Sequence, residues 1–476
     1  MAKNSAENRT RRIQKTSAAS TVSKEDDLPE TSGNIFNALL DRLGFEADFG
    51  KKDREKITVS QIPGMAWDGV KNAASNTKNV MFNKTMAFDK PLFVLVIVLV
   101  VVGFIMMSSA SYAYAYSYKD DSMYFINRQL LFSILGILAM LLMSTVSPDK
   151  LKGAASYVLW FISLALLAAV LFQGKINGVR RWIGVGAFSF QPSEIAKFTA
   201  ILVCATYISY HYKEINVMTY GNRKRKLLAS QNKFFGSIYR FHRSFATGVW
   251  PFLWRVVPIL ALLVAEPHLS CTIIILLIVG TLMLLGGTRK GYFIALLVLV
   301  ALGIYLIVFL GVVSYGRARV EIWLNPFSDA KGEGWQTIQS LYAISSGGLF
   351  GVGFGNSRQK YMYIAEPQND FIFAVVCEEL GFVGAVIIIL IFVAFVWRGF
   401  AISLANPDRF RRFVGIGITA QIGYQMLLNV AVVTNLVPNT GISLPFFSYG
   451  GTSIIMLMAE IGVLLAISRS SPNKVM

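Results

Sequence analysis

The sequence predicts an all-α, polytopic membrane protein of about ten transmembrane helices, with both chain ends inside and a large extracytoplasmic loop between helices 7 and 8. Three observations lead to this fold class: long uncharged apolar blocks, an excess of apolar over charged residues, and an uneven distribution of Lys and Arg between alternate loops. The 476 residues are 54% hydrophobic and 15% charged, whereas soluble domains are nearer half apolar and a quarter charged. This composition indicates a lipid environment.

The apolar blocks give ten spans, each long enough to cross the ~30 Å hydrocarbon core as a helix that satisfies its own backbone. The expected spans are 92–110, 128–146, 154–173, 191–210, 249–265, 269–286, 291–314, 370–397, 413–434 and 445–468. The first begins behind a polar stretch, so we expect it to remain as an anchor and not to be cleaved as a signal peptide.

The loops set the orientation of these spans. With the N-terminus inside, the inner loops carry eighteen Lys or Arg and the longer outer loops carry nine, as expected when basic residues accumulate in the cytoplasm. The same rule accounts for the net charge of +18 without nucleic acid as a partner. The basic cluster at 223–226 is then a topology determinant or a contact with anionic lipid.

Residues 1–90 differ from the rest, with fifteen Lys or Arg and twelve Asp or Glu. Such a composition cannot bury a core, so we predict a largely disordered cytoplasmic tail. An apolar face within 35–43 could form a membrane-surface or partner-binding helix, or have no function. Residues 91–470 form the transmembrane domain and 471–476 a second cytoplasmic tail. The three cysteines lie in or beside apolar spans, with no disulfide or metal spacing.

The outer loop 315–369 is longer than a connector, and its Trp, Tyr, Phe and Gly residues favour an ordered functional segment. It ends at Asp370, and the apolar run FIFAVV follows at once. Asp370 is therefore a carboxylate at the outer mouth of a helix. It is either a helix cap or a functional group.

Two pairs of charged residues within the apolar spans are candidates for structural polar contacts. Glu378 and Glu379 follow two turns after the start of the eighth span, where charges face an interior cavity or pair with a basic residue. Glu194 and Lys197 are three residues apart and can pair on one helix face. We expect a structural role for these four side chains.

Basic residues on the outer side run against the charge rule and need another explanation. Arg180 and Arg181 lie between the third and fourth spans, and Lys360 lies in the long loop. They could bind an anion, because Arg matches phosphate oxygens. A salt bridge to Glu366 or Glu333 is the equal alternative.

Four stretches resemble the SEDS family (shape, elongation, division and sporulation proteins) and occur in the family's order. They are KINGVRRWIGVGAFSFQPSEIAKF, NPFSDAKGEGWQTIQSLYAI, GNSRQKYMYIAEPQNDFIFAVVCEELGFVGA and TGISLPFFSYGGTS. The resemblance covers 90–470, and motifs of this length are highly specific. The long polar N-terminus and the motif around Lys360 are most similar to the division or sporulation branch.

The resemblance implies a ten-helix peptidoglycan glycosyltransferase in the bacterial cytoplasmic membrane. Its substrates would be lipid II, a disaccharide-pentapeptide on undecaprenyl pyrophosphate, and the lipid-linked glycan. Its partners would be a class B penicillin-binding protein and other divisome or elongasome proteins. In an inverting displacement, Asp370 would be the general base, and Lys360, Arg180 and Arg181 would hold the pyrophosphate. A divalent cation, Mg²⁺ or Mn²⁺, could share that task.

Trp335, Gln336 and Glu366 complete the candidate substrate-binding residues, and packing is an equal alternative for Trp335 and Gln336. Two positions depart from the family's motifs. His268 stands where members often have Asp in EPDLGT, which would alter the helix-end geometry or the local pH response. Gln368 stands where members usually have His, so no His is needed as a base.

Two rival functions stay open. A lipid II flippase predicts charges along a path through the bilayer, and a non-catalytic division scaffold predicts that Asp370 is replaceable. The reactive and anion-binding candidates cluster on the outer side, which favours chemistry there.

Overall fold

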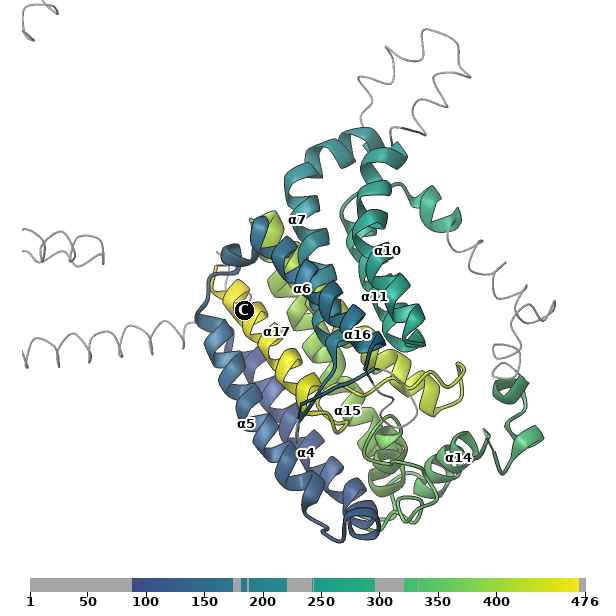
Figure 1. The fold of residues 1–476 in the computed structure, drawn as a ribbon. Coiled ribbons are helices and arrows are strands. Elements are labelled where there is room, and N and C mark those ends of the chain that lie inside the picture. Colours follow the sequence, from purple (N-terminus) through teal and green to yellow (C-terminus); the bar gives the residue numbers. More distant parts are fainter. Residues whose placement is uncertain are drawn as a thin grey trace, which may run out of the picture. The chain divides into compact units, whose positions relative to one another are not determined.

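The computed structural model (Figure 1) describes residues 88–173, 181–185, 188–220, 242, 244–295, 321–332 and 334–470. The predicted N-terminal tail with its apolar helix, Arg180, the basic cluster at 223–226, most of the seventh span and the C-terminal tail lie outside these residues.

The described chain is built from helices. They are α4 (Lys90–Lys119), α5 (Tyr124–Thr145), η2 (Pro148–Leu151), α6 (Ala154–Leu171), α7 (Pro192–Tyr220), α10 (Trp250–Ala265), α11 (Leu269–Leu285), η3 (Pro326–Asp329), α14 (Trp335–Gly347), α15 (Ile372–Ala405), α16 (Arg409–Val433) and α17 (Gly451–Arg469). Nine predicted spans coincide with α4–α7, α10, α11 and α15–α17 within the described ranges.

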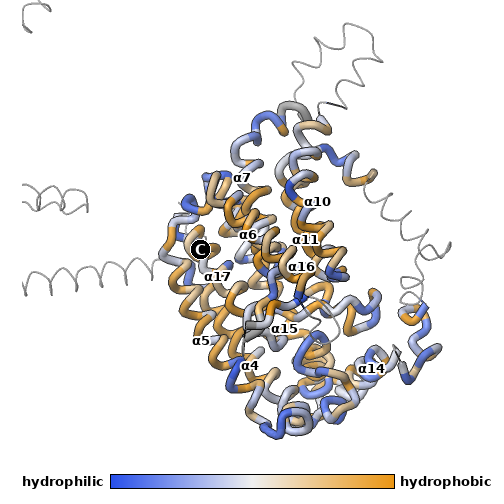
Figure 2. The backbone as a smooth tube through the Cα atoms, viewed as in Figure 1, coloured by the Kyte–Doolittle hydropathy of each residue, from blue (hydrophilic) through white to orange (hydrophobic). Residues whose placement is uncertain are grey.

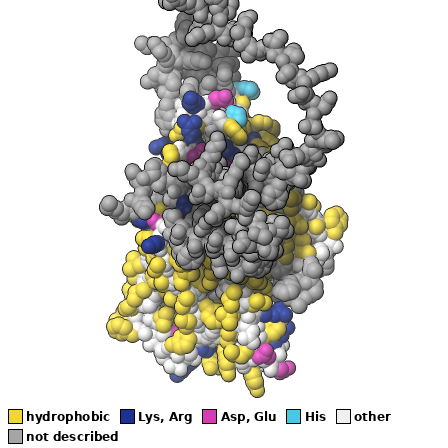
Figure 3. All heavy atoms as spheres, turned by 90° about the vertical axis from the view of Figure 1, so that its left-hand side faces the viewer, with side chains coloured by type: hydrophobic (Ala, Val, Ile, Leu, Met, Phe, Trp, Pro, Cys, Tyr) yellow, Lys and Arg dark blue, Asp and Glu magenta, His cyan; other side chains and the backbone are white. Residues whose placement is uncertain are grey.

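These helices make the protein a multi-pass membrane protein. Six of them, α4, α5, α6, α15, α16 and α17, are long and apolar enough to cross a membrane, and α10 and α11 are shorter apolar helices. Figure 2 shows apolar residues along the helices and polar residues toward their ends. Figure 3 shows hydrophobic side chains over much of the described surface on one face. Such a surface suits contact with lipid.

The helix ends define two ends of the bundle. Asp89 caps α4, and Arg398 of α15 donates to the Asp89 carboxylate with Nη2 2.7 Å from Oδ2. The Asp89 N–H also donates to Ser468 Oγ of α17 at 3.0 Å. We call this the Asp89 end. Since α4 and α15 run in opposite directions, Lys119 and Asp370 share the other end, the Asp370 end.

Small residues let the helices pack closely, as is usual in membranes. A Cβ on Gly462 of α17 would lie 2.4 Å from the Met140 carbonyl oxygen of α5, and one on Gly136 would lie 3.1 Å from Met458 Cγ. Helix α17 therefore packs along α5. Helix α15 likewise packs on α16, and α6 on α7.

A short antiparallel hairpin precedes α7 and was absent from the all-α prediction. Strand β1 (Ile183–Val185) pairs with β2 (Phe188–Phe190), with Gly184 opposite Ser189. Three residues per strand give too little alternation to be recognised in a sequence. The hairpin carries Arg181 and Trp182 ahead of β1 to the cavity wall at the Asp370 end.

The long outer loop is fastened to a break in α15. At Gly381 the backbone leaves the helical conformation, with φ 68° and ψ −170°. Segment 348–353 supplies the hydrogen bonds lost at this break: Val352 N donates to Glu378 O at 3.0 Å, and Phe382 N donates to a carbonyl of the same segment at 2.9 Å. The first turns of α15, which follow Asp370, are thus held rigidly against the loop.

Candidate active site

Asp370 lies in the turn that leads into α15, and its backbone is clamped. The carbonyls of residues 368–370 accept hydrogen bonds, in order, from Tyr449 N (2.8 Å), Ser448 Oγ (2.9 Å) and Asn429 Nδ2 (2.7 Å). These donors come from α16 and from the loop before α17. Two segments distant in sequence therefore fix the position of Asp370.

The Asp370 carboxylate does not act as the helix cap. The N-cap residue of α15 is Phe371, which makes no side-chain capping bond. On its open side the carboxylate faces Gly441, where a Cβ would lie 3.1 Å from Asp370 Oδ2. Gly441 has a left-handed φ of 69°, which favours glycine. The space beside the carboxylate thus depends on the absence of a side chain at Gly441.

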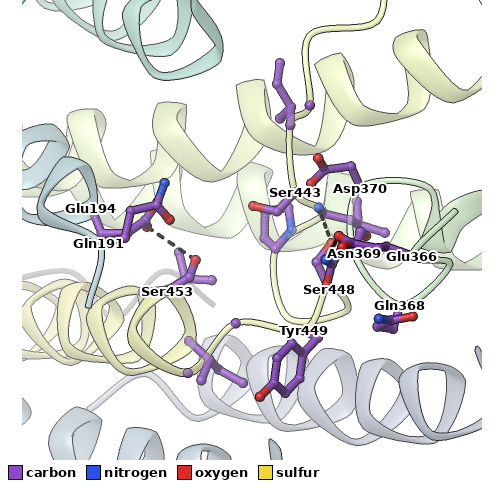
Figure 4. Close-up of a pocket in the computed structure, with 18 of the residues that line it drawn as sticks. Gln191, Glu194, Glu366, Gln368, Asn369, Asp370, Ser443, Ser448, Tyr449 and Ser453 are labelled. Atoms are coloured by element: carbon purple, nitrogen blue, oxygen red, sulfur yellow. Dashed lines mark hydrogen bonds between the residues drawn. The ribbon is translucent and has the colours of Figure 1, made fainter. Parts of the chain in front are cut away.

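A cavity of about 680 Å³ opens beside Asp370. Its walls come from α4, α5, α7, α11, α16 and α17 and from the loops before α15 and α17. Figure 4 places Glu366, Asn369 and Asp370 together on one side and Glu194 with Ser453 on the other. A concave space of this size on which polar and charged groups converge is a candidate ligand site.

Burial raises the pKa of Asp370 to about 6. The next cause is repulsion by Glu366, which also raises the pKa, and the Arg181 guanidinium opposes both by favouring the charged carboxylate. Glu366 has an unusual left-handed φ of 49°, and its Oε2 accepts from Asn369 Nδ2 at 2.7 Å. A carboxylate with this pKa can accept a proton near neutral pH.

Four cations line the same cavity: Lys119, Arg128, Arg181 and Lys197, of which Lys197 is paired with Glu194. Lys119 and Arg128, at the adjoining ends of α4 and α5, lie over the Tyr124 ring at 5.5 and 4.4 Å from its centroid. Arg128 also donates to the Tyr449 hydroxyl. An anionic ligand in the cavity would therefore meet guanidinium and ammonium groups from more than one helix.

Lys360 lies outside this set, in a buried ion pair. Its Nζ is 2.8 Å from Glu379 Oε1 and donates to Ser109 Oγ at 2.9 Å and to Gly355 O at 2.7 Å. The ammonium has three N–H donors, and all three have partners here. This geometry favours the salt-bridge alternative over pyrophosphate binding, with Glu379 as the partner in place of the expected Glu366 or Glu333.

Other residues of the long outer loop also brace its backbone. Trp335 Nε1 donates to Tyr363 O at 2.7 Å, and Gln336 Nε2 donates to Ala365 O at 3.1 Å. Glu378 accepts two backbone N–H groups of the same loop. For Trp335 and Gln336 these contacts favour packing over substrate contact, because each side chain holds the segment that leads to Asp370.

We expect Lys360→Met to lower the free energy of unfolding by about 3–5 kcal/mol, because it leaves the Glu379 carboxylate buried without its cation. The double variant Lys360→Met/Glu379→Gln should recover much of this loss, since it removes both charges. Thermal unfolding of the detergent-solubilised protein measures both effects. A Lys360→Met variant as stable as wild type would contradict the ion-pair assignment.

A second polar cluster lies deeper in the bundle. Glu194 Oε1 is 2.9 Å from Lys197 Nζ within α7, and Ser453 Oγ donates to Glu194 Oε2 at 3.3 Å. On α17, the buried Glu460 accepts from Gln421 Nε2 at 2.7 Å. Glu194 and Lys197 both line the cavity and form a polar part of its wall.

His268 and Glu266 are electrostatic neighbours of Arg181. Burial lowers the pKa of His268 to about 3 and raises the pKa of Glu266 to about 8, so both are neutral at pH 7. Between them, the carbonyl of Pro267 accepts from Arg181 Nη2. The His at this position therefore adds an uncharged imidazole to the cavity wall.

Several residues of the site escaped the sequence-based prediction, namely Lys119, Arg128, Asn429 and Glu460. A signal existed for three of them: Lys119 is a basic residue on the predicted outer side, and Arg128 and Glu460 are charges in apolar spans. Asn429 gave no signal, because a single amide in an apolar run is common.

No group of three or more His, Cys, Asp or Glu among the described residues could hold a metal ion. Mg²⁺ takes six oxygen ligands but usually keeps several waters and shares substrate phosphates. The carboxylates of Glu366 and Asp370 are therefore the side chains that a cation arriving with a pyrophosphate would meet.

Comparisons with known proteins agree with these motifs. A family model described as a cell cycle protein, covering FtsW, RodA and SpoVE, matches residues 90–473. Stage V sporulation protein E of Bacillus subtilis (strain 168) is 39% identical over 358 residues, which cover 74% of this chain and 89% of that protein. The probable peptidoglycan glycosyltransferase FtsW of Trichlorobacter lovleyi is 33% identical over 352 residues, which cover 73% and 84%.

Solved structures have the same fold. A chain from a study of polymerisation and crosslinking by a peptidoglycan synthase complex aligns with a TM-score of 0.61 at 29% identity and covers 82% of this chain and 100% of its own length. The rod shape determining protein RodA of Thermus thermophilus aligns with a TM-score of 0.55 at 26% identity, over 82% and 99%. The chain thus has a RodA-like fold and belongs to the SEDS family of FtsW, RodA and SpoVE proteins.

Proposed function

We propose that the protein is a peptidoglycan glycosyltransferase that polymerises lipid II at the outer face of the bacterial cytoplasmic membrane during division or sporulation. The observation that carries this proposal is Asp370, a clamped carboxylate with a pKa raised to about 6 at the wall of a cavity lined by cations. Relatives described as probable peptidoglycan glycosyltransferases support the reaction class.

Asp370 is the general base of this reaction. It takes the proton from the 4-hydroxyl of the acceptor sugar as that oxygen attacks the anomeric carbon of the lipid-linked donor. The new C–O bond forms on the face opposite the leaving group, so the configuration inverts. The bond between the anomeric carbon and the phosphate oxygen breaks, and its electron pair leaves with undecaprenyl pyrophosphate. This good leaving group needs no protein acid.

Arg181 stabilises the charge that develops on the pyrophosphate, because its guanidinium is the cation that acts on Asp370 within the cavity. Arg180, its neighbour in the chain, joins it in this proposal. Lys119 and Arg128 add positive charge to the same cavity. Glu366, after burial, raises the pKa of the base further. A divalent cation would enter as a complex with the pyrophosphate and reach the carboxylates of Asp370 and Glu366.

The proposal includes ten membrane spans with both chain ends inside and the Asp370 end outside. The positions of Arg398, Arg411 and Arg469 at the Asp89 end support this orientation, because basic residues favour the cytoplasmic side. A class B penicillin-binding protein is the proposed partner that crosslinks the new strands, in keeping with the solved peptidoglycan synthase complex.

Polymerisation of purified lipid II tests the function. The purified protein, with a candidate class B penicillin-binding protein, is expected to form glycan strands that a muramidase digests. If no strands form while labelled lipid II crosses the membrane of proteoliposomes, the flippase alternative replaces the enzyme. If neither activity is found, the scaffold alternative gains support.

The pH dependence of polymerisation should report the pKa of Asp370. The base works when it is deprotonated, so activity is retained above a pKa of about 6 and lost as the pH falls through it. Glu366→Gln removes the repulsion that raises this pKa, so the acidic limb should move to lower pH, toward the ordinary value of 3.8. Arg181 favours the charged carboxylate in both proteins, and His268 is already neutral at these pH values. An acidic limb unmoved by Glu366→Gln would contradict this assignment.

A further inference from the structure

We propose that Asn429 of α16 is a positioning residue for the general base, holding the Asp370 carboxylate at a fixed place beside the backbone of Gly441. This inference rests on the proposed function. Asn429 does not touch the cavity, so its effect on the reaction passes through Asp370.

Asn429 joins the two segments that form the environment of the base. Its side chain is fully buried, and Nδ2 donates to Asp370 O at 2.7 Å and to Ile442 O at 2.6 Å. The amide NH₂ has two hydrogens, so both are used. One side chain on a rigid helix therefore fixes the spacing between the loop before α15 and the loop before α17.

The Asp370 carbonyl oxygen can accept from Asn429 because no backbone N–H of α15 donates to it. At the start of α15, Ala374 N donates to Phe371 O at 3.0 Å. Without Asn429, the Asp370 carbonyl would be left in a buried position without that partner, which costs about 1–3 kcal/mol. The turn would relieve that cost by moving, and the carboxylate would move with it.

The opposite segment is held from a second side. The Ser270 hydroxyl of α11 donates to the Thr440 carbonyl and also lies 3.1 Å from Gly441 O, while Asn429 holds the next carbonyl, that of Ile442. A Cβ on Gly441 would lie 3.1 Å from Asp370 Oδ2. The gap between this backbone and the carboxylate is therefore set by contacts from α11 and α16.

The placement of polar residues on α16 agrees with this role. Gln421, Gln425 and Asn429 recur every four residues and so share one face of the helix. Gln421 donates to Glu460, and Gln425 lines the cavity. This polar face connects Glu460 with Asp370, and Asn429 is its last member, in contact with Asp370.

The test compares Asn429→Leu and Asn429→Asp with Asn406→Leu. Leu and Asp preserve the approximate size of Asn429 but cannot donate to the two carbonyls. Asn406 is the matched control at the Asp89 end, because it is also fully buried and its Nδ2 donates to Ile467 O at 3.2 Å and to Ser470 Oγ at 3.0 Å. Each variant is assayed for thermal unfolding, kcat, KM for lipid II and pH profile.

Both Asn429 variants are expected to lose about 100-fold in kcat with a KM near wild type, as for a base displaced by about 1 Å. For Asn429→Leu the acidic limb should also move to lower pH, because the freed carboxylate gains water. Asn406→Leu should lose comparable thermal stability and keep its kcat and pH profile.

Three outcomes are decisive against the inference. A wild-type kcat and pH profile in both folded Asn429 variants would overturn it. An equal kcat loss in Asn406→Leu would reduce Asn429 to a general structural role. If Asp370→Asn kept full activity, the proposed base itself would fail, and that result is distinguishable because it leaves the Asn429 contacts intact.

Discussion

Replacing Asp370 by Asn is expected to lower the rate of glycan-strand formation by about 10²–10⁴-fold, the contribution of a positioned general base. Asn has the shape of Asp but cannot take the proton from the acceptor hydroxyl. The variant should remain folded, because the clamp on residues 368–370 is made to backbone carbonyls. Its thermal stability should equal or exceed that of wild type, since burial and Glu366 both disfavour the Asp370 charge. Single-turnover polymerisation of lipid II measures the rate.

Asp120→Asn is the matched control for this substitution. Asp120 lies at the same end of the bundle, is exposed to solvent and has a left-handed φ of 53°, a conformation that Asn also adopts. Both substitutions remove one carboxylate charge, but only Asp370 lines the cavity. Equal activities of Asp370→Asn and Asp120→Asn would remove Asp370 as the base.

The membrane spans could be predicted because an uncharged apolar run of about twenty residues has one stable arrangement in lipid. The same reasoning missed two features. The break at Gly381 lies inside the eighth predicted span, two residues after Glu379, and it is stabilised by hydrogen bonds to segment 348–353, which no local pattern reveals. The hairpin β1–β2 is too short for its alternation to be read.

The site was predictable to the extent that local chemistry indicates it. Asp370 follows a long polar loop and precedes an apolar span, and Arg181 is a basic residue on the outer side. Both line the cavity. Lys360 gave the same signal, but its partners Glu379 and Ser109 are far away in the chain. Tertiary packing alone decides which of these cations lines the cavity and which forms a buried ion pair.

Arg181→Met is expected to reduce kcat/KM for lipid II by about 10²–10³-fold, the usual effect of losing one charge-stabilising donor. It should also move the acidic limb of the pH profile to higher pH. Arg181 lowers the pKa of Asp370, so its removal raises that pKa, and a higher pH is then needed to deprotonate the base. Arg181→Lys should restore part of the limb position, because a cation remains, but less of the rate, since Lys lacks the planar fork that matches phosphate oxygens.

Arg358→Met is the matched control for this prediction, because Arg358 is an exposed Arg of the long outer loop that does not line the cavity. It should leave the rate and the pH profile unchanged.

The two readouts of Arg181→Met separate its two roles. A limb that moves without a loss of rate would leave Arg181 as an electrostatic neighbour of the base only. A loss of rate without a moved limb would place the guanidinium on the leaving group but too far from Asp370 to act on it. If neither changes, the pyrophosphate is held elsewhere, and Lys119 and Arg128, which also line the cavity, become the side chains to replace.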